Sequence, residues 1–272
     1  MNEIQSKSNY KYLKYLAKVG SKDIHPKKEV ATSFLMEKLD IKEGQKILEV
    51  GFGTGETLLR IASGFNVGLY GIDSMPKMYN LARKRLKLEG LDGKANLNLL
   101  QENSDFPYGD NAFDIIYTES VLGFQDKPDL FRLVNEILRV LKPSGRFAVN
   151  DAVWKQGLNN AIIHKINVGC LKDFGMRQAS EEYWTINDWI KLYKQYGFKL
   201  ISADLIEHLN GNKSPSPSLT EGESVRKNFG IWGEKFINPF LIKDKIGYRK
   251  KLRTHKEDGQ YIEPWIIILQ KE

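Results

Sequence analysis

The sequence contains one cysteine, Cys170, among 272 residues, and it has no long apolar run. A single cysteine excludes an intrachain disulfide and a thiolate cluster for a metal, so a reducing compartment is the default expectation. No segment approaches the roughly 20 apolar residues that cross a bilayer. The N-terminal stretch Met1–Gln5 also lacks the features of a signal sequence. We therefore expect a cytoplasmic protein without a membrane span.

The charge balance is basic, with a formal net charge of +7. The lysines are spread along the whole chain, which favours a solvated surface over a nucleic-acid footprint. An apolar content of 41% with 11% aromatic residues can fill the core of one large α/β domain.

Strand and helix patterns alternate along the chain. Apolar runs and period-two patterns predict strands, and apolar residues at helical spacing predict the helices between them, most clearly over residues 129–141. The predicted strands cover residues 46–50, 66–72, 95–100, 113–118, 146–150, 198–206 and 261–269. This alternation predicts an α/β fold with a mostly parallel sheet.

The segment Ile47–Leu59 joins a buried strand to three alternate glycines and a helix. Because glycine tolerates positive φ and has no Cβ, the backbone of Gly51, Gly53 and Gly55 can turn tightly and touch a ligand. The helix that follows brings free N–H groups to the same place. The spacing differs from the G-x-G-x-x-G of dinucleotide sites. Glu49 would repel a pyrophosphate but can accept a hydrogen bond from an ammonium group, so the ligand is expected to carry an amino-acid moiety.

This motif and three later ones resemble those of the class I S-adenosylmethionine-dependent methyltransferases. Within that class, the sequence is similar to small-molecule methyltransferases of the domain 11/25 type. The later motifs are Asp73 after the second strand, Gln101–Tyr108 with Asn111–Asp114, and Leu141–Arg146. The resemblance is strong over about residues 29–150 and weaker over 185–206. It implies a Rossmann-like sheet of seven strands, helices on both faces, helical cap insertions, and S-adenosyl-L-methionine as cofactor.

The resemblance also implies roles for individual residues. The glycines would pack against the methionine part of the cofactor, Asp73 would accept both ribose hydroxyls, and Glu102 would accept from the adenine amino group. Ser74 is additionally expected to cap the following helix. The full set of cofactor-binding residues implied is Glu49, Gly51, Gly53, Gly55, Asp73, Ser74, Met75, Glu102, Asn103, Ser104, Tyr117 and Thr118.

Methyl transfer from a sulfonium depends on positioning and exclusion of water, without a metal or a covalent intermediate. Aromatic faces would attract the sulfonium, and Tyr117, Trp154 and Tyr15 are the candidates. A general base is needed only if the acceptor arrives protonated, and Glu119, Asp151 and His164 are the candidates. Tyr117, Glu119 and Asp151 are expected to face the methyl group. A Mg²⁺ site built from Glu119, Asn150 and Asp151 is a less favoured alternative.

We expect residues 1–272 to form a single methyltransferase domain. Within it, 1–28 would be an N-terminal helical lid, 29–151 the cofactor-binding core, and 152–183 with 210–259 the insertions that form the acceptor pocket. The insertions are rich in aromatic residues, which either line that pocket or form the insertions' own core: Trp154, Phe174, Tyr183, Trp184, Phe229, Trp232 and Phe236.

The predicted function is methylation of a small, partly hydrophobic metabolite. The sequence Tyr117–Ser120 after the fourth strand lacks the prolines with which nucleic-acid amino-methyltransferases hold a flipped base. An RNA methyltransferase that uses the basic run Lys243–Lys256 is the first alternative. An NAD(P)-dependent oxidoreductase and a non-methylating S-adenosylmethionine-binding protein are the others. The acceptor atom and the oligomeric state are left open by the sequence.

Overall fold

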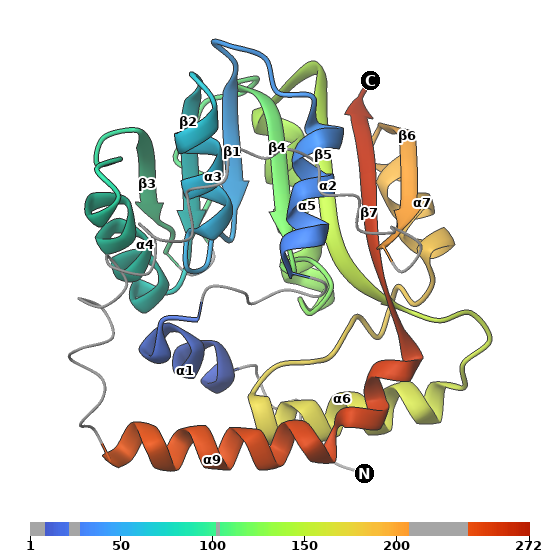
Figure 1. Ribbon diagram of the computed structural model, residues 1–272. Helices are drawn as coiled ribbons and strands as arrows, with labels where there is room; N and C mark the ends of the chain where they lie inside the picture. The colour runs from blue at the N-terminus through green and yellow to red at the C-terminus, as the bar shows by residue number, and fades with distance from the viewer. Residues whose placement is uncertain (1–8, 22–27, 102–103, 207–238) are drawn as a thin grey trace.

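Seven strands form one sheet in the order β3-β2-β1-β4-β5-β7-β6, as Figure 1 shows. The computed structural model describes residues 9–21, 28–101, 104–206 and 239–272. Neighbouring strands from β3 to β5 are parallel, whereas β7 is antiparallel to both β5 and β6. The strands are β1 (Lys46–Val50), β2 (Gly68–Asp73), β3 (Ala95–Leu99), β4 (Phe113–Glu119), β5 (Leu141–Trp154), β6 (Phe198–Leu205) and β7 (Ile262–Lys271). The predicted α/β fold with a mostly parallel, seven-stranded sheet is confirmed.

Helices cover both faces of this sheet. One face packs against α2 (Lys28–Leu39), α3 (Glu56–Gly64) and α4 (Pro76–Leu88), and the other against α5 (Lys127–Val140) and α7 (Ile186–Gln195). The α5 helix shows why the sequence folds in this way, because its apolar positions Leu130, Val134 and Ile137 are completely buried against the sheet. Each such side chain contributes about 1.5–3 kcal/mol through burial.

Three further helices lie beyond the carboxyl ends of the parallel strands (Figure 1). They are α1 (Lys11–Val19), α6 (Asn160–Phe174) and α9 (Pro239–Thr254), and the short η2 (Lys256–Tyr261) follows α9. Leu16 and Ala17 of α1 pack on Met78 of α4. Tyr12 of α1 joins the three helices, because its ring centroid lies 5.3 Å from that of Phe174 and 5.1 Å from that of Tyr248. We call these three helices, η2 and the loop after α6 (residues 175–185) the cap.

Two local features differ from the sequence-based expectation. Ser74 does not cap α4, because the helix begins one residue later, with Met75 at the N-cap and Pro76 in the first turn. β5 is longer than the predicted 146–150, because its residues up to Trp154 pair with β7. A capping box starts α7, with the Thr185 N–H donating to Oδ2 of Asp188 at 2.9 Å. None of the described helices has the length and apolar character to span a bilayer.

Candidate active site

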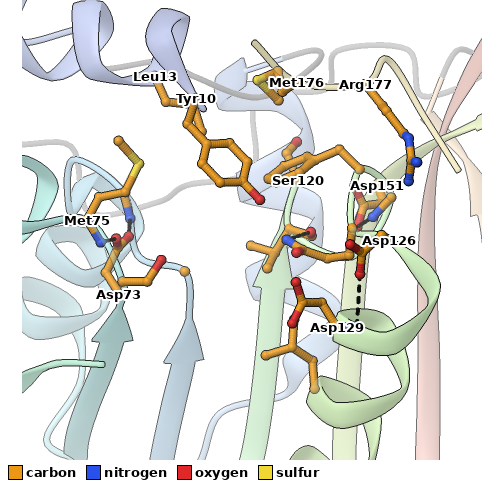
Figure 2. A pocket seen from close by; sticks show the side chains of 18 of the residues that line it. Tyr10, Leu13, Asp73, Met75, Ser120, Asp126, Asp129, Asp151, Met176 and Arg177 are labelled. Atoms are coloured by element: carbon orange, nitrogen blue, oxygen red, sulfur yellow. Dashed lines mark hydrogen bonds between the residues drawn. The ribbon is translucent and has the colours of Figure 1, made fainter. Parts of the chain in front are cut away.

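A cavity of about 2140 Å³ lies between the carboxyl ends of the parallel strands and the cap. Its floor comes from the glycine loop after β1, the end of β2, the loop after β4 and the end of β5. Its roof comes from α1, α6 and the loop that follows α6. Pockets for one drug-sized ligand measure about 300–1,000 Å³, so this cavity has room for two ligands. Figure 2 shows Asp73 and Met75 at one end, Asp151 and Arg177 at the other, and Tyr10 between them.

The glycine loop forms the floor under the Asp73 end. Gly51 has φ of 76°, and a Cβ there would lie 2.4 Å from Cγ2 of Val121. Gly55, with φ of 77°, is the N-cap of α3, and no side chain caps that helix. Neither Gly55 nor the first turn of α3 lines the cavity, so Gly51 and Gly53 are the glycines of this loop that a ligand could touch. The loop has the conformation that the glycine spacing predicts.

Asp73 connects this loop to the helix after β2. Its Oδ2 accepts a hydrogen bond of 2.8 Å from the Gly53 N–H, and its Oδ1 accepts one of 2.7 Å from the Met75 N–H. Burial raises the pKa of Asp73 to about 6, although both N–H groups oppose that rise. Asp73, Ser74 and Met75 all line the cavity, as expected for a nucleoside site. Each carboxylate oxygen retains a second lone pair that a hydroxyl can use.

Tyr117 does not face the cavity. Its side chain is fully buried in the layer between the sheet and α2–α4, and its hydroxyl donates a hydrogen bond of 2.8 Å to Oε2 of Glu49. The prediction that its ring faces the methyl group is wrong, because side chains alternate along a strand and position 117 points to the helix-covered face. Burial raises the pKa of Glu49 well above its usual range, and the neighbouring charge of Glu119 adds to this effect. Glu49 itself is 3% exposed and lies beneath the cavity floor.

Glu119 lies on the cavity wall at the end of β4. Its Oε1 accepts a hydrogen bond of 2.6 Å from Oγ1 of Thr57, and its Oε2 accepts one of 2.9 Å from Nδ2 of Asn150. Oγ1 of Thr32 also donates to Oε2, at 3.1 Å. These contacts turn the carboxylate toward α2 and α3. Glu119 is thus better placed to stabilise positive charge near the glycine loop than to accept a proton at the Asp151 end.

Asp151 lies at the other end of the floor, on β5. Its Oδ2 accepts hydrogen bonds from the N–H groups of Leu122 at 3.0 Å and Gly123 at 3.1 Å. The residue is 6% exposed and lines the cavity. Burial raises its pKa to about 7, although hydrogen bonds from the Gly123 and Leu122 N–H groups oppose the rise. A carboxyl group of this kind can be deprotonated and accept a proton at neutral pH.

The oxygen atoms proposed for a Mg²⁺ site point in different directions. Glu119 and Asn150 hydrogen-bond to one another, whereas Asp151 holds the loop after β4. Within the described ranges, side chains with metal-ligand spacing come together only in the cap, at Cys170, His255 and Asp258. The described residues therefore give no support to a Mg²⁺ site between β4 and β5.

His164 lies on the cavity rim, on α6. Its side chain is 73% exposed, and its Nδ1 lies 3.7 Å from Oε1 of Glu181. A group this open to water is poorly placed to move a proton in an enclosed reaction, so Asp151 is the stronger candidate for a general base.

The adenine end of the predicted site is only partly described. Glu102 and Asn103 lie outside the described residues. Ser104 does not line the cavity, and its hydroxyl donates to the Gln101 carbonyl at 2.8 Å. Thr118 is fully buried beside the opposite helix layer and does not line the cavity. The cofactor contacts implied for Ser104 and Thr118 are therefore not supported by their positions.

The aromatic residues at the cavity differ from those expected. Trp154 is buried in the cap's own core, where its Nε1 donates to the Ser180 carbonyl at 2.7 Å, and Tyr15 packs on Tyr248. Phe174 and Trp184 also belong to this cap core or pack on it, whereas Phe229, Trp232 and Phe236 lie outside the described residues. The cavity is instead lined by Tyr10 and Phe124, whose ring centroids are 6.0 Å apart. Their positions depend on tertiary packing, and no motif marks either residue.

Ser120 is a third cavity residue that the sequence does not reveal. It follows β4 directly, has φ of 55°, and lines the cavity. Its buried Oγ has no hydrogen-bond partner within the described part of the chain. A non-glycine residue with positive φ and an unpaired hydroxyl is typical of a functional position. Its place after a strand of a parallel sheet is the one signal that could have identified it.

Comparisons with known proteins agree with this geometry. The family described as "Methyltransferase domain" matches residues 47–145. The methyltransferase GfsG of Streptomyces halstedii is 26% identical over 221 residues, which is 78% of this chain and 76% of that protein. The uncharacterized methyltransferase YodH of Bacillus subtilis is 30% identical over 71% of this chain and 76% of its own length. The chain belongs to the class I S-adenosylmethionine-dependent methyltransferases. It is therefore a methyltransferase enzyme.

Other methyltransferases are similar over a smaller part of their length or in fold alone. Phosphoethanolamine N-methyltransferase 1 of Arabidopsis thaliana is 32% identical over 84% of this chain, but the chain spans only 43% of that protein. The phosphoethanolamine N-methyltransferase 2 of Haemonchus contortus in complex with S-adenosyl-L-methionine has a TM-score of 0.63 at 18% identity, over 95% of this chain and 56% of that one. A geranyl diphosphate C-methyltransferase from Streptomyces coelicolor has a TM-score of 0.60 at 14% identity, over 90% of this chain and 78% of that one.

The residues of this methyltransferase fit its cofactor. S-adenosylmethionine carries an ammonium and a sulfonium against one carboxylate, so it has a net positive charge. The carboxyl groups of Asp73 and Glu119 line the same part of the cavity as Gly51 and Gly53. A bound cofactor would thus meet carboxyl groups and a loop whose backbone it can approach closely.

Proposed function

We propose that this methyltransferase methylates an O–H or N–H group of a small molecule that is enclosed between the sheet and the cap. The position of Asp151 carries the proposal. It is a buried carboxyl group with a pKa of about 7, at the end of the cavity that lies away from Asp73. A general base is useful only for an acceptor that arrives protonated, as hydroxyl and ammonium groups do.

The shape of the cavity supports a small acceptor. The volume of about 2140 Å³ is about twice the upper range of pockets that hold one ligand. The roof formed by α1 and α6 encloses the reacting groups and limits the size of the acceptor. The names of two similar proteins also refer to small acceptors, phosphoethanolamine and geranyl diphosphate.

An RNA acceptor has less support. The exposed cations of α9 do not line the cavity, and in Figure 1 this helix lies below α1, on the side away from the sheet. They are Lys243, Lys245, Arg249, Lys250 and Arg253. An RNA bound to that surface would leave its bases outside the enclosed cavity.

When bound, S-adenosylmethionine supplies an electrophilic methyl group. In this proposal the residues of the chain have three roles. Tyr10 and Phe124 exclude water and place the acceptor. The N–H groups of Leu122 and Gly123 hold Oδ2 of Asp151 in place, so the carboxylate can take the proton that the acceptor loses. Glu119 and Asp73 stabilise the positive charge at the opposite end.

The experiment combines product discovery with one variant. A small-molecule extract from the source organism is incubated with the enzyme and S-adenosylmethionine labelled in the methyl group, and labelled products are identified by mass spectrometry. We expect a labelled O-methyl or N-methyl compound, and a loss of about 10²–10⁴-fold in its rate of formation with Asp151→Asn. Asp92→Asn is the matched control, because Asp92 is exposed and remote from the cavity. The absence of any labelled O-methyl or N-methyl product, or full activity of Asp151→Asn, would contradict the proposal.

A further inference from the structure

Arg177 projects into the cavity from the cap. It follows α6 by three residues and lines the cavity, with a half-buried side chain. Figure 2 shows the side chain extending from the roof on the Asp151 side of the cavity, away from Asp73. It therefore lies at the end that the acceptor would occupy.

The backbone on both sides of Arg177 is held firmly. The Gly175 carbonyl accepts hydrogen bonds from the N–H groups of Asn9 at 3.0 Å and Tyr10 at 2.9 Å. The Gln178 N–H donates to Oδ1 of the buried Asn167 at 2.8 Å. These hydrogen bonds lie two residues before Arg177 and one residue after it. The fold therefore fixes the position of its backbone above the floor of the cavity. A fixed cation costs less entropy when it binds a ligand than a mobile surface side chain does.

The guanidinium group of Arg177 forms no hydrogen bond or ion pair with a described residue. The other described arginines that are not exposed all form ion pairs. Arg85 lies 2.9 Å from Oε2 of Glu56, and Arg139 lies 2.7 Å from Oε2 of Glu136. Pairing of this kind is what half-buried arginines ordinarily need, since their charge is never lost by deprotonation.

The acidic residues closest in sequence and those on the floor are engaged elsewhere. Oε1 of Glu181 accepts from Asn167 at 3.3 Å, and Oε2 of Glu182 accepts from the Ser180 hydroxyl at 3.3 Å. Asp151 is held by backbone N–H groups of the floor. Lys172 also lines the same roof, so the cap contributes further positive charge there.

An acceptor that fills the cavity would remove water from the Arg177 guanidinium. Removing water from an unpaired charge is unfavourable, so a neutral acceptor would bind poorly beside it. An oxyanion would instead form charge-assisted hydrogen bonds with the planar guanidinium, in bidentate geometry.

We propose that Arg177 binds an oxyanion group of the acceptor, so that the substrates are small anionic molecules with a carboxylate or a phosphate at one end and the methylated O–H or N–H at the other. This inference rests on the proposed function and narrows it to one chemical class. Arg177 would determine specificity, while Asp151 would meet the nucleophilic end.

The test begins with a small-molecule extract separated on an anion exchanger into a retained and an unretained pool. Each pool is incubated with the enzyme and methyl-labelled S-adenosylmethionine. We expect label in products from the retained pool alone. Label confined to the unretained pool would overturn this inference and leave the proposed function intact, whereas no label in either pool would overturn both. Treatment of the retained pool with a phosphatase distinguishes the sources, since activity is lost for a phosphate ester and kept for a carboxylate.

Variants then connect the result to one residue. With the retained pool as substrate, Arg177→Leu should raise the apparent KM about ten- to a hundredfold, the range expected when a hydrogen-bonded charge is lost. Arg177→Lys should recover part of this loss. Arg253→Leu is the matched control, because Arg253 is an exposed cap residue that does not line the cavity. The affinity for S-adenosylhomocysteine, measured by calorimetry, should be unchanged in all three. An unchanged KM in Arg177→Leu would overturn the assignment.

Discussion

The carboxylate of Asp73 accepts a hydrogen bond of 2.8 Å from the N–H of Gly53, so the end of β2 and the glycine loop after β1 are joined directly. Its other oxygen accepts from Met75 at the start of α4. One side chain therefore holds together the two loops that form the nucleoside end of the cavity. It does so while its own burial raises its pKa to about 6.

This arrangement predicts a pH-dependent affinity for the cofactor. Below about pH 6 Asp73 becomes protonated and loses an acceptor for the ribose hydroxyls, so the dissociation constant of S-adenosylhomocysteine should rise as pH falls through this value. Asp73→Ala should weaken binding about ten- to a hundredfold at neutral pH and remove this pH dependence. Calorimetry between pH 5 and pH 8 measures both effects, with Asp92→Ala as control. Normal affinity in Asp73→Ala would limit Asp73 to joining the two loops.

A second prediction separates backbone strain from steric overlap in the glycine loop. Gly51→Ala places a Cβ 2.4 Å from Val121 at φ of 76°, whereas Gly157→Ala has φ of 82° with nothing within 4 Å. Both variants should lose about 1–2 kcal/mol of stability from the left-handed backbone. Gly51→Ala should lose about 1–3 kcal/mol more from overpacking, and its cofactor affinity should also fall. Denaturant unfolding and calorimetry measure these changes. Equal stability losses in the two variants would contradict the overlap at Gly51.

A third prediction concerns the pH dependence of turnover. If Asp151 accepts the proton of the acceptor, it acts in its deprotonated form, which becomes populated as pH rises through about 7. The kcat/KM should therefore increase about tenfold per pH unit below this value and level off above it. In Asp151→Asn the residual activity should no longer follow this profile. A wild-type rate that is flat from pH 5 to pH 8 would exclude Asp151 as the base.

A fourth prediction concerns the N-terminal part of the cap. Deletion of residues 1–24 removes α1, and with it Tyr10 from the cavity and the cover of Met78 on α4. The core sheet does not depend on α1, so the shortened protein should fold and bind cofactor, somewhat more weakly. Turnover should fall about 10²-fold, because the acceptor loses its positioning and its shield from water. Circular dichroism controls for folding, and full turnover without these residues would show that α1 is dispensable for catalysis.

A fifth prediction concerns the stability of the cap. His255 donates from both ring nitrogens when protonated, with Nδ1 2.6 Å from Asp258 and Nε2 3.0 Å from Asp173. Two other titratable groups lie around it. Nζ of Lys251 is 3.8 Å from Oδ1 of Asp173, and Sγ of Cys170 is 3.9 Å from Nδ1 of His255. Burial lowers the pKa of His255, but the hydrogen bonds to Asp173 and Asp258 outweigh burial and raise the pKa above its ordinary value.

Because the folded protein binds this proton more tightly than the unfolded chain does, His255 stabilises the fold fully below about pH 6.5, the unfolded pKa. That contribution should be lost as pH rises through the higher folded pKa. The free energy of unfolding of the wild type should be about 1.5–3 kcal/mol higher than that of His255→Gln at low pH. The difference should be smaller at high pH. His164→Gln, at a side chain that is 73% exposed, is the matched control. A constant difference between pH 5 and pH 9 would contradict a charged His255.

Local signals in the sequence determined most of the fold and one end of the site. The strand 46–50 and the helix that contains Leu130, Val134 and Ile137 follow from apolar periodicity alone. The glycine spacing predicted a loop in which Gly51 has positive φ, and Asp73 followed from its place after the second strand. Residues close in sequence determine these features. A helix or strand buries side chains at a regular spacing, and that spacing is visible in the sequence.

Only the tertiary structure decided which side chains face the cavity. Tyr117 points to the buried layer and Ser120 to the cavity, because the pleat of β4 and the turn that follows set the direction of each residue. Tyr10 and Arg177 reach the cavity because the Gly175 carbonyl joins the start of α1 to the end of α6. A contact between residues so distant in sequence leaves no local pattern. The sequence alone therefore determined the fold and the cofactor, whereas the packing of the cap on the sheet decided the residues that meet the acceptor.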